Sequence, residues 1–215
     1  MAPHPFDLET LRTERAVLCL RFLDRDGVLE AARAAVRGGL RILEITLTTP
    51  GALDLIAALR NDTPWVGAGT VLTVADAHRV ADAGGTFALS PVFDPDVFEA
   101  GRSRGLWMLP GAATPSEIFR AHQHGASAVK VFPADALGGP SFIRAVRGPL
   151  PHIPLVPTRG PDSENFHDYF DAGATAVGVG SEVFADGLDP RGVQTRAAHV
   201  RKALDQASAD GTPSN

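Results

Sequence analysis

The stretch that decides the fold is Ser127-Ala-Val-Lys-Val-Phe-Pro133, which reads as a fully buried strand with a lysine at its centre. A strand that is apolar on both faces is typical of a parallel sheet covered on both sides, and it rarely carries an ammonium group. Lys130 is also the only lysine before Lys202. Burial favours the neutral amine, which can attack a carbonyl. The alternative is a structural ion pair between Lys130 and a buried carboxylate.

Similar short apolar stretches recur on both sides of this one and alternate with amphipathic segments. The expected strands cover residues 16–20, 41–46, 65–68, 86–90, 106–109, 127–132, 153–157 and 175–180. The expected helices cover residues 7–15, 26–37, 50–60, 73–83, 94–104, 115–124, 139–147, 162–172 and 189–207. Eight strand-helix units of ~25 residues predict a closed (β/α)8 TIM barrel. A doubly wound open sheet is the alternative, but no Gly-x-Gly-x-x-Gly follows the first strand.

The composition favours one α/β domain. The chain has 215 residues, of which 44% are hydrophobic, and no linker interrupts the pattern. We therefore expect a single barrel domain over residues 1–207, with a helix at its start, and a polar, disordered tail over residues 208–215.

Charge and motif content narrow the partners and the compartment. A net charge of −5 argues against nucleic acid or an anionic membrane surface as the main partner. The start has no secretory pattern and no apolar run reaches ~20 residues, so we expect a cytoplasmic protein. Cys19, the single cysteine, excludes an internal disulfide and is expected to pack as a small hydrophobe. The histidines show no metal-ligand spacing, so we expect no metal.

Polar residues gather where the expected strands end, and in a barrel these ends form the active-site face. The strand alternation that places Ile42 inward also turns Glu44 into the barrel. Further polar, glycine or proline positions at strand ends are Thr70, Pro91, Gly111, Phe132 beside Lys130, Thr158, Gly160, Gly180 and Ser181. We expect these residues to surround one site.

The motifs at these strand ends resemble those of one family. They are Glu44-Ile-Thr-Leu-x-Thr, Val66-Gly-Ala-Gly-Thr-Val-Leu, Ser90-Pro91, Leu109-Pro-Gly, Val129-Lys-Val-Phe-Pro-Ala, Leu137-Gly-Gly, Pro157-Thr-x-Gly and Val179-Gly-Ser. Together they resemble the 2-keto-3-deoxy-6-phosphogluconate (KDPG) aldolase family, which also includes 4-hydroxy-2-oxoglutarate (KHG) aldolases. The resemblance runs in order from Val17 to Phe184.

This resemblance implies a (β/α)8 barrel, usually a homotrimer, that cleaves a 2-keto acid to pyruvate and an aldehyde. It implies a class I mechanism that uses no metal or other cofactor. By matching motif, Lys130 would form the Schiff base and Glu44 would transfer protons. The alternative is an inactive barrel that keeps the two residues as a buried ion pair.

Three positions depart from the family pattern where substrate would bind. Thr48 stands where many members have an arginine that holds the substrate carboxylate. Arg21 matches an arginine of the galactonate-type branch, and with the Thr70 hydroxyl it would replace that contact. The alternative for Arg21 is a solvated position at the rim.

The larger departure is Pro157-Thr158-Arg159-Gly160, where the family has Pro-Thr-Gly-Gly. In the family the amides of this segment and of the Gly180-Ser181 motif hold a phosphate. If the replaced glycine has a positive φ, arginine strains or blocks this cradle. Three outcomes stay open for Arg159: an altered acceptor site, phosphate binding through the side chain, or no effect. Val92 also replaces a glycine and would narrow the pocket.

The leading hypothesis is therefore a lyase, a Schiff-base aldolase acting on a 2-keto-3-deoxy (phospho)sugar acid or on 4-hydroxy-2-oxoglutarate. The same chemistry on a different, non-phosphorylated biosynthetic substrate is a second hypothesis. A phosphate-binding isomerase or epimerase without a covalent lysine is a third, and an inactive keto-acid-binding barrel is the non-enzyme hypothesis.

Overall fold

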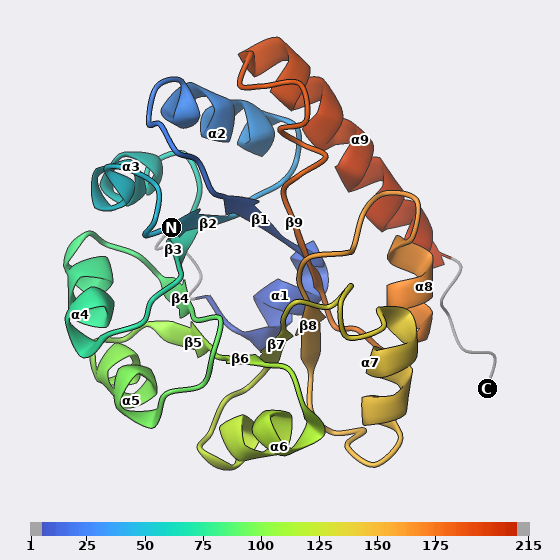
Figure 1. The fold of residues 1–215 in the computed structure, drawn as a ribbon. Helices are drawn as coiled ribbons and strands as arrows, with labels where there is room; N and C mark the ends of the chain where they lie inside the picture. The colour runs from blue at the N-terminus through green and yellow to red at the C-terminus, as the bar shows by residue number, and fades with distance from the viewer. Residues whose placement is uncertain (1–5, 210–215) are drawn as a thin grey trace.

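The computed structural model describes residues 6–209, in which strands alternate with helices and form a central barrel inside a ring of helices (Figure 1). The strands are β1 (Ala16–Leu20), β2 (Ile42–Thr46), β3 (Trp65–Gly69), β4 (Phe87–Leu89), β5 (Trp107–Leu109), β6 (Gly111–Ala112), β7 (Val129–Val131), β8 (Leu155–Pro157) and β9 (Val177–Val179). The helices are α1 (Leu8–Glu14), α2 (Val28–Arg37), α3 (Ala52–Leu59), α4 (Val74–Asp82), α5 (Pro95–Ser103), α6 (Pro115–Gln123), α7 (Pro140–Arg147), α8 (Phe166–Asp171) and α9 (Pro190–Ala209).

The barrel is closed by parallel pairing between the first and last strands. One sheet has the order β5-β4-β3-β2-β1-β9, and the other has the order β6-β7-β8. Strand β1 pairs with β9, with Val17 opposite Gly178, and a bridge between Thr158 and Gly178 joins the second sheet to the first. The predicted (β/α)8 class is confirmed. The fifth barrel strand differs from the prediction, because Pro110 divides it into β5 and β6 and has no N–H to donate to a ladder.

The residues that point into the barrel form their own apolar cluster, separate from the layer between strands and helices. Phe6 and Leu11 belong to this inner cluster, although they come from α1 and the residues before it. The Phe6 ring lies 4.5 Å from the Phe87 ring and 5.1 Å from the Trp107 ring. Helix α1, which lies inside the outline of the barrel in Figure 1, therefore closes the amino-terminal end of the lumen.

Several helices begin at the polar residues that their sequences indicate. The side chains of Asp7, Thr73 and Asp94 each accept a hydrogen bond from a backbone N–H in the first turn of the helix that follows. Thr114 and Glu117 form a complete capping box at the start of α6. Each of these caps satisfies backbone donors that the first turn leaves unpaired, and they fix where the helices enter the outer ring.

The long C-terminal helix completes the ring. Helix α9 packs against α2 and α8, so the last helix closes the outer ring beside the helix that follows β1 (Figure 1). It continues to Ala209, and residues 208 and 209 of the expected tail are therefore helical. The rest of that tail lies outside the described residues, as do residues 1–5 of the expected domain. No helix among residues 6–209 is both long and apolar enough to cross a membrane.

Candidate active site

Two buried charged side chains meet inside the carboxyl-terminal half of the barrel. Lys130 is the central residue of β7 and Glu44 the central residue of β2, and both point into the lumen as the strand alternation predicts. Their residues are 4% and 0% exposed, and Lys130 Nζ lies 3.4 Å from Glu44 Oε1. The ammonium group also lies 5.5 Å from the centre of the Phe132 ring. The structure therefore places the two residues in direct contact.

Glycines at the inward positions of β3 and β9 leave room for the side chains of Glu44 and Thr158. A Cβ atom on Gly69 would lie 1.8 Å from Glu44 Oε1, and one on Gly178 would lie 2.5 Å from Thr158 Oγ1. Glu44 Oε2 is buried and has no hydrogen-bond partner among the described residues. The second carboxylate oxygen is thus available to a water molecule or to a substrate, because an unpaired buried acceptor is costly unless it is used.

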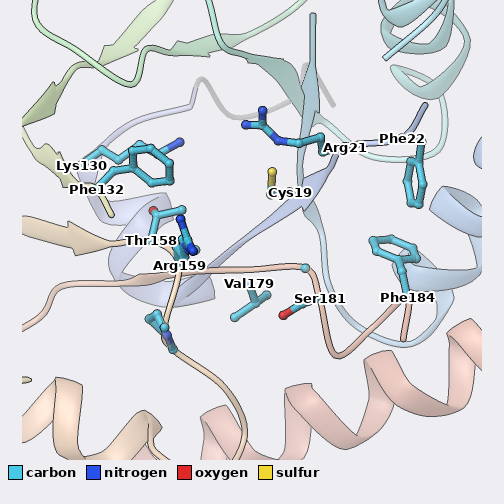
Figure 2. A pocket seen from close by; sticks show the side chains of 14 residues that line it. Cys19, Arg21, Phe22, Lys130, Phe132, Thr158, Arg159, Val179, Ser181 and Phe184 are labelled. Carbon is cyan, nitrogen blue, oxygen red and sulfur yellow. The ribbon is translucent and has the colours of Figure 1, made fainter. Parts of the chain in front are cut away.

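A cavity of about 630 Å³ opens above the pair. In Figure 2, Lys130 and Phe132 lie on one side of this cavity, Phe22 and Phe184 on the other, and Arg21 between them. Its lining residues are Cys19, Arg21, Phe22, Lys130, Phe132, Thr158, Arg159, Gly160, Pro161, Gly178, Val179, Gly180, Ser181 and Phe184. The volume of the cavity is in the range of small-molecule sites, and the amine of Lys130 lies at its base.

Most of the residues expected at the site line this cavity. They are Lys130, Arg21, Phe132, Thr158, Arg159, Gly160, Gly180 and Ser181. Glu44 lies beneath the lining, in contact with Lys130. Arg21 is connected to the expected Thr70 by a hydrogen bond of 3.3 Å from Nη2 to Oγ1.

Thr48 and Pro91 lie apart from the cavity lining. The Thr48 hydroxyl is 3.0 Å from that of Thr46, and Thr48 lines a separate hollow beside α3. Pro91 lies against the backbone of Gly111, since a Cβ atom added to Gly111 would be 2.3 Å from the carbonyl oxygen of Pro91. Val92 is 53% exposed and does not line the cavity, so it does not narrow it. Strand ends alone do not distinguish residues that face the cavity from residues that support it.

Two strand ends at the site have a left-handed backbone. Thr70 has φ 61° and Arg159 has φ 64°, and only one other described non-glycine residue, Arg15, has a positive φ. Such a conformation costs a residue with a Cβ atom on the order of 1 kcal/mol relative to glycine. The backbone at Arg159 thus has a conformation that suits glycine, which is the residue that the family motif Pro-Thr-Gly-Gly has at this position. Arg159 Nε lies 3.3 Å from Asp135 Oδ2, so the side chain is paired at the cavity mouth.

Cys19 lines the cavity although the sequence predicts only a packing role for it. It pairs with Glu44 in the register of β1 and β2, so the alternation that turns Glu44 inward also turns Cys19 inward. Burial, followed by the negative charge of Glu44, raises the pKa of the Cys19 thiol to about 12. The thiol therefore stays protonated at neutral pH and does not act as a nucleophile. The sequence signal that could have placed Cys19 at the site is the alternation of side chains along the strand, because Cys19 lies two residues after the inward-facing Val17.

The arrangement supplies an amine nucleophile and a carboxylate within proton-transfer reach. A lysine amine that attacks a carbonyl forms a carbinolamine and then an iminium ion, which accepts electrons from an adjacent bond. A carboxylate in contact can take and return the protons that these steps require. Among residues 6–209, no cluster of three or more His, Cys, Asp or Glu side chains could hold a metal ion.

Comparison with known proteins gives consistent matches. A family model described as KDPG and KHG aldolase matches residues 8–194. The 2-dehydro-3-deoxy-phosphogluconate aldolase of Pseudoalteromonas atlantica is 36% identical over 173 residues, which cover 80% of each chain. A probable 2-dehydro-3-deoxy-6-phosphogalactonate aldolase of Rhizobium meliloti is 34% identical and covers 88% of this chain and 91% of its own. A KDPG aldolase structure from Legionella pneumophila, with pyruvate captured as a covalent carbinolamine, has a TM-score of 0.77 at 28% identity, covering 94% and 98%.

Proposed function

The chain belongs to the KDPG and KHG aldolase family, and we propose that Lys130 forms its Schiff base while Glu44 transfers the protons. The protein is thus a class I aldolase that releases pyruvate and an aldehyde. The observation that carries the residue roles is the 3.4 Å contact between two buried charged groups at the base of an open cavity. Lys130 is the lysine that the cavity reaches.

The first half of the reaction takes place at Lys130 Nζ. Glu44 accepts a proton from the ammonium group, and the neutral amine adds to the C2 carbonyl of a 2-keto acid. Loss of water from the carbinolamine gives an iminium ion. The closed barrel floor below the pair excludes bulk water from this step, because Phe6 and Leu11 seal the lumen.

The second half breaks the C3–C4 bond. A base removes the proton of the C4 hydroxyl, the aldehyde departs, and the bonding electrons flow into the iminium to give an enamine. Protonation at C3 and hydrolysis then release pyruvate and regenerate the amine. Glu44 serves as the base and as the acid, directly or through one water, and Oε2 is the oxygen that has no other described partner. Each such proton transfer contributes on the order of 10²–10⁴ in rate.

Arg21 is the group that we assign to the substrate carboxylate. Its guanidinium lines the cavity and is oriented by the Thr70 hydroxyl at 3.3 Å. A guanidinium matches a carboxylate with two parallel hydrogen bonds, which would hold C1 of the keto acid while C2 faces Lys130. Arg21 thus supplies the contact that Thr48 cannot make.

The substrate classes named for the relatives set the range for this chain. The relatives are named for 2-dehydro-3-deoxy-phosphogluconate and for 2-dehydro-3-deoxy-6-phosphogalactonate. We infer a substrate of this type or 4-hydroxy-2-oxoglutarate, with a pyruvate unit at the lysine and a variable aldehyde toward Arg159. The homotrimer and the cytoplasmic location stay predictions, because the first rests on the family resemblance and the second on the sequence pattern alone.

Trapping with borohydride tests the lysine assignment. The protein is incubated with pyruvate and sodium borohydride, and intact-mass spectrometry with peptide mapping locates the reduced adduct. We expect one adduct on Lys130 and none in the Lys130→Ala variant. A folded wild-type protein that gains no adduct would contradict the mechanism and favour the keto-acid-binding barrel. An adduct on Lys202 would contradict the residue assignment.

Glu44→Gln separates proton transfer from Schiff-base formation. The amide keeps the size of the side chain and loses the base, so we expect kcat to fall by about 10²–10⁴-fold. The borohydride adduct should still form on Lys130 at long incubation. A kcat within a few-fold of the wild-type value would show that another group transfers the protons.

A further inference from the structure

The segments that follow β8 and β9 bring four unused backbone donors to the cavity. The N–H groups of Arg159, Gly160, Gly180 and Ser181 donate to no described residue, and all four residues line the cavity. A β-bridge joins the two segments. Adjacent N–H groups that the protein itself does not use form a site for an anion, and the loops after the last two strands of a β/α barrel often hold a phosphate. This end of the cavity therefore suits a phosphate group on the substrate.

The side chain of Arg159 adds a guanidinium beside these donors. Its own N–H is one of the four, so the side chain begins at the anion site, and Figure 2 shows it among the side chains that line the cavity. Arg159 Nε lies 3.3 Å from Asp135 Oδ2, whereas the two Nη atoms have no partner among the described residues. These terminal nitrogens can therefore donate to a phosphate, which a planar guanidinium matches with two parallel hydrogen bonds.

The ion pair between Arg159 and Asp135 is weak enough to be exchanged. The two side chains are 64% and 45% exposed, and ion pairs that are open to solvent contribute little to stability. Asp135 is not among the residues that line the cavity. A phosphate that already accepts hydrogen bonds from the backbone can compete with this carboxylate for the guanidinium, because both are anions and the phosphate offers more acceptor oxygens.

The backbone conformation of Arg159 supports a role for its side chain. Its φ of 64° is one that glycine adopts without strain. A larger residue held in such a conformation beside a cavity indicates that the side chain has a use there. Thr70, with φ 61°, is the other left-handed residue at this site, and its hydroxyl orients Arg21 at 3.3 Å. By the same reasoning the guanidinium of Arg159 serves the site.

We propose that Arg159 is a clamp for the terminal phosphate of the substrate, which leaves Asp135 and closes on a phosphate held by the four amides. The inference rests on the proposed function, because it concerns the far end of the substrate that Lys130 holds. Arg21 and Arg159 then hold the carboxylate and the phosphate at the two ends of one substrate. Arg159 thereby sets the preference for a phosphorylated substrate over its unphosphorylated form.

Arg159→Gly tests the clamp, because glycine suits φ 64° and keeps the backbone N–H. Pyruvate release is measured with the 6-phosphates of 2-keto-3-deoxygluconate and 2-keto-3-deoxygalactonate and with both unphosphorylated acids. With the better phosphate we expect kcat/KM to fall by about tenfold, mostly through a higher KM, since the clamp binds an end that does not react. With the unphosphorylated acid the value should stay within about twofold. Arg159→Lys should recover part of the loss, because it keeps the charge without the planar fork.

Arg15→Gly is the matched control for this variant. Arg15 is the other described arginine with a left-handed backbone, at φ 62°, and it follows α1 and does not line the cavity. The same substitution there should leave the ratio of kcat/KM between phosphorylated and unphosphorylated substrate unchanged. An unchanged ratio in Arg159→Gly as well, or a wild-type protein that cleaves neither phosphate, would overturn the proposal.

Asp135→Asn tests the exchange of partners. Removal of the competing carboxylate should raise kcat/KM with the phosphate by about two- to fivefold, as expected for an exposed ion pair. The same change should have no effect when Arg159 is already glycine. A fall in kcat/KM in Asp135→Asn would show that the carboxylate holds the guanidinium in its binding position, which would overturn the exchange.

The outcomes separate this inference from the function on which it depends. A protein that forms the pyruvate adduct on Lys130, but whose Arg159→Gly variant loses nothing with the phosphate, retains the proposed function and loses the clamp. A protein that forms no adduct on Lys130 fails at the first step, whatever its preference. A larger loss in Arg159→Gly with 4-hydroxy-2-oxoglutarate than with the phosphate would assign the clamp to a carboxylate and would also overturn the proposal.

Discussion

At its amino-terminal end the barrel lumen is filled by Phe6, Leu11 and Phe87, whereas at its carboxyl-terminal end it holds Lys130 and Glu44 beneath an open cavity. Both ends are built by the same alternation along the same strands. What differs is the size of the inward side chains. Large apolar residues fill the lower layers, and glycines such as Gly69 leave the upper layer open. The same alternation of inward and outward side chains can thus produce a packed core or an open site, depending on the size of the inward side chains on the neighbouring strands.

The largest expected effect comes from making the upper end resemble the lower one. Lys130→Met with Glu44→Leu replaces the ion pair by apolar side chains and should abolish pyruvate release. Stability should be unchanged or higher by about 1–4 kcal/mol, because buried pairs are costly to desolvate. Lys130→Met alone leaves Glu44 without its partner and should cost about 3–5 kcal/mol. Denaturant unfolding of the single and double variants checks this. A double variant less stable than the wild-type protein would show that the pair stabilises the barrel.

The next largest effect is expected from a substitution in the packed, amino-terminal end of the lumen. Phe87→Ala removes a fully buried ring beside Phe6 and should lower the free energy of unfolding by about 3–5 kcal/mol. The KM for the substrate should not change, because the cavity lies at the other end of the lumen. Phe119→Ala, at a ring that is 42% exposed on α6, is the control and should cost within about 0.5 kcal/mol. A rise in KM without a loss of stability would contradict the separation of the two ends.

A smaller effect comes from filling the space beside the carboxylate. Gly69→Ala places a Cβ atom 1.8 Å from Glu44 Oε1, so the carboxylate must move away from Lys130. We expect kcat to fall on the order of 10²-fold, as for a displacement of about 1 Å in a catalytic group. Gly148→Ala is the matched control, since its Cβ atom would come no closer than 3.5 Å to Ala145 O. Steady-state kinetics of both variants decide whether the glycine acts through Glu44.

The smallest effect concerns the thiol beside the pair. The unfolded Cys19 thiol ionises near pH 9.0, whereas the folded thiol keeps its proton until about pH 12. The unfolded state therefore releases this proton first, and the free energy of unfolding falls as the pH rises from about 9 to 12. At pH 10 the loss should be about 1 kcal/mol relative to pH 8. Cys19→Ser should lose less over the same interval in denaturant unfolding, and an identical loss would show that the thiol is not protected.

The sequence predicts most of the fold because its signals are local. The apolar stretches place all eight barrel strands, and the alternation from Ile42 turns Glu44 inward toward Lys130. Strand ends are less well predicted, since β7 stops at Val131 where the sequence suggests a strand to Phe132. The Phe132 N–H still donates to Ala112 O at 3.1 Å, and the ladder ends at Pro133 because proline has no N–H to continue it.

The outer part of the site is predicted less completely because it depends on contacts between distant segments. Pro-Thr-Arg-Gly identifies Arg159 as unusual, but its pairing with Asp135 requires the loops after β7 and β8 to meet. The engagement of the Ser163 amide by Glu182 likewise joins loops from two strands. Thr48 has a motif that suggests a role at the cavity, yet its hydroxyl turns toward Thr46. Spacing alone carries no information on such contacts.

The pairing of β1 with β9 has a consequence for the chain as it is synthesised. The barrel cannot close before Val179 has left the ribosome, because β1 completes its pairing only with β9. Lys130 follows Glu44 by 86 positions, which at ~5–20 residues per second corresponds to about 4–17 s of translation. During that interval the carboxylate of Glu44 has no lysine partner, and the edge of β1 stays unpaired for longer, until β9 has been synthesised. The pair that we propose as catalytic therefore cannot form until more than half of the chain has been synthesised.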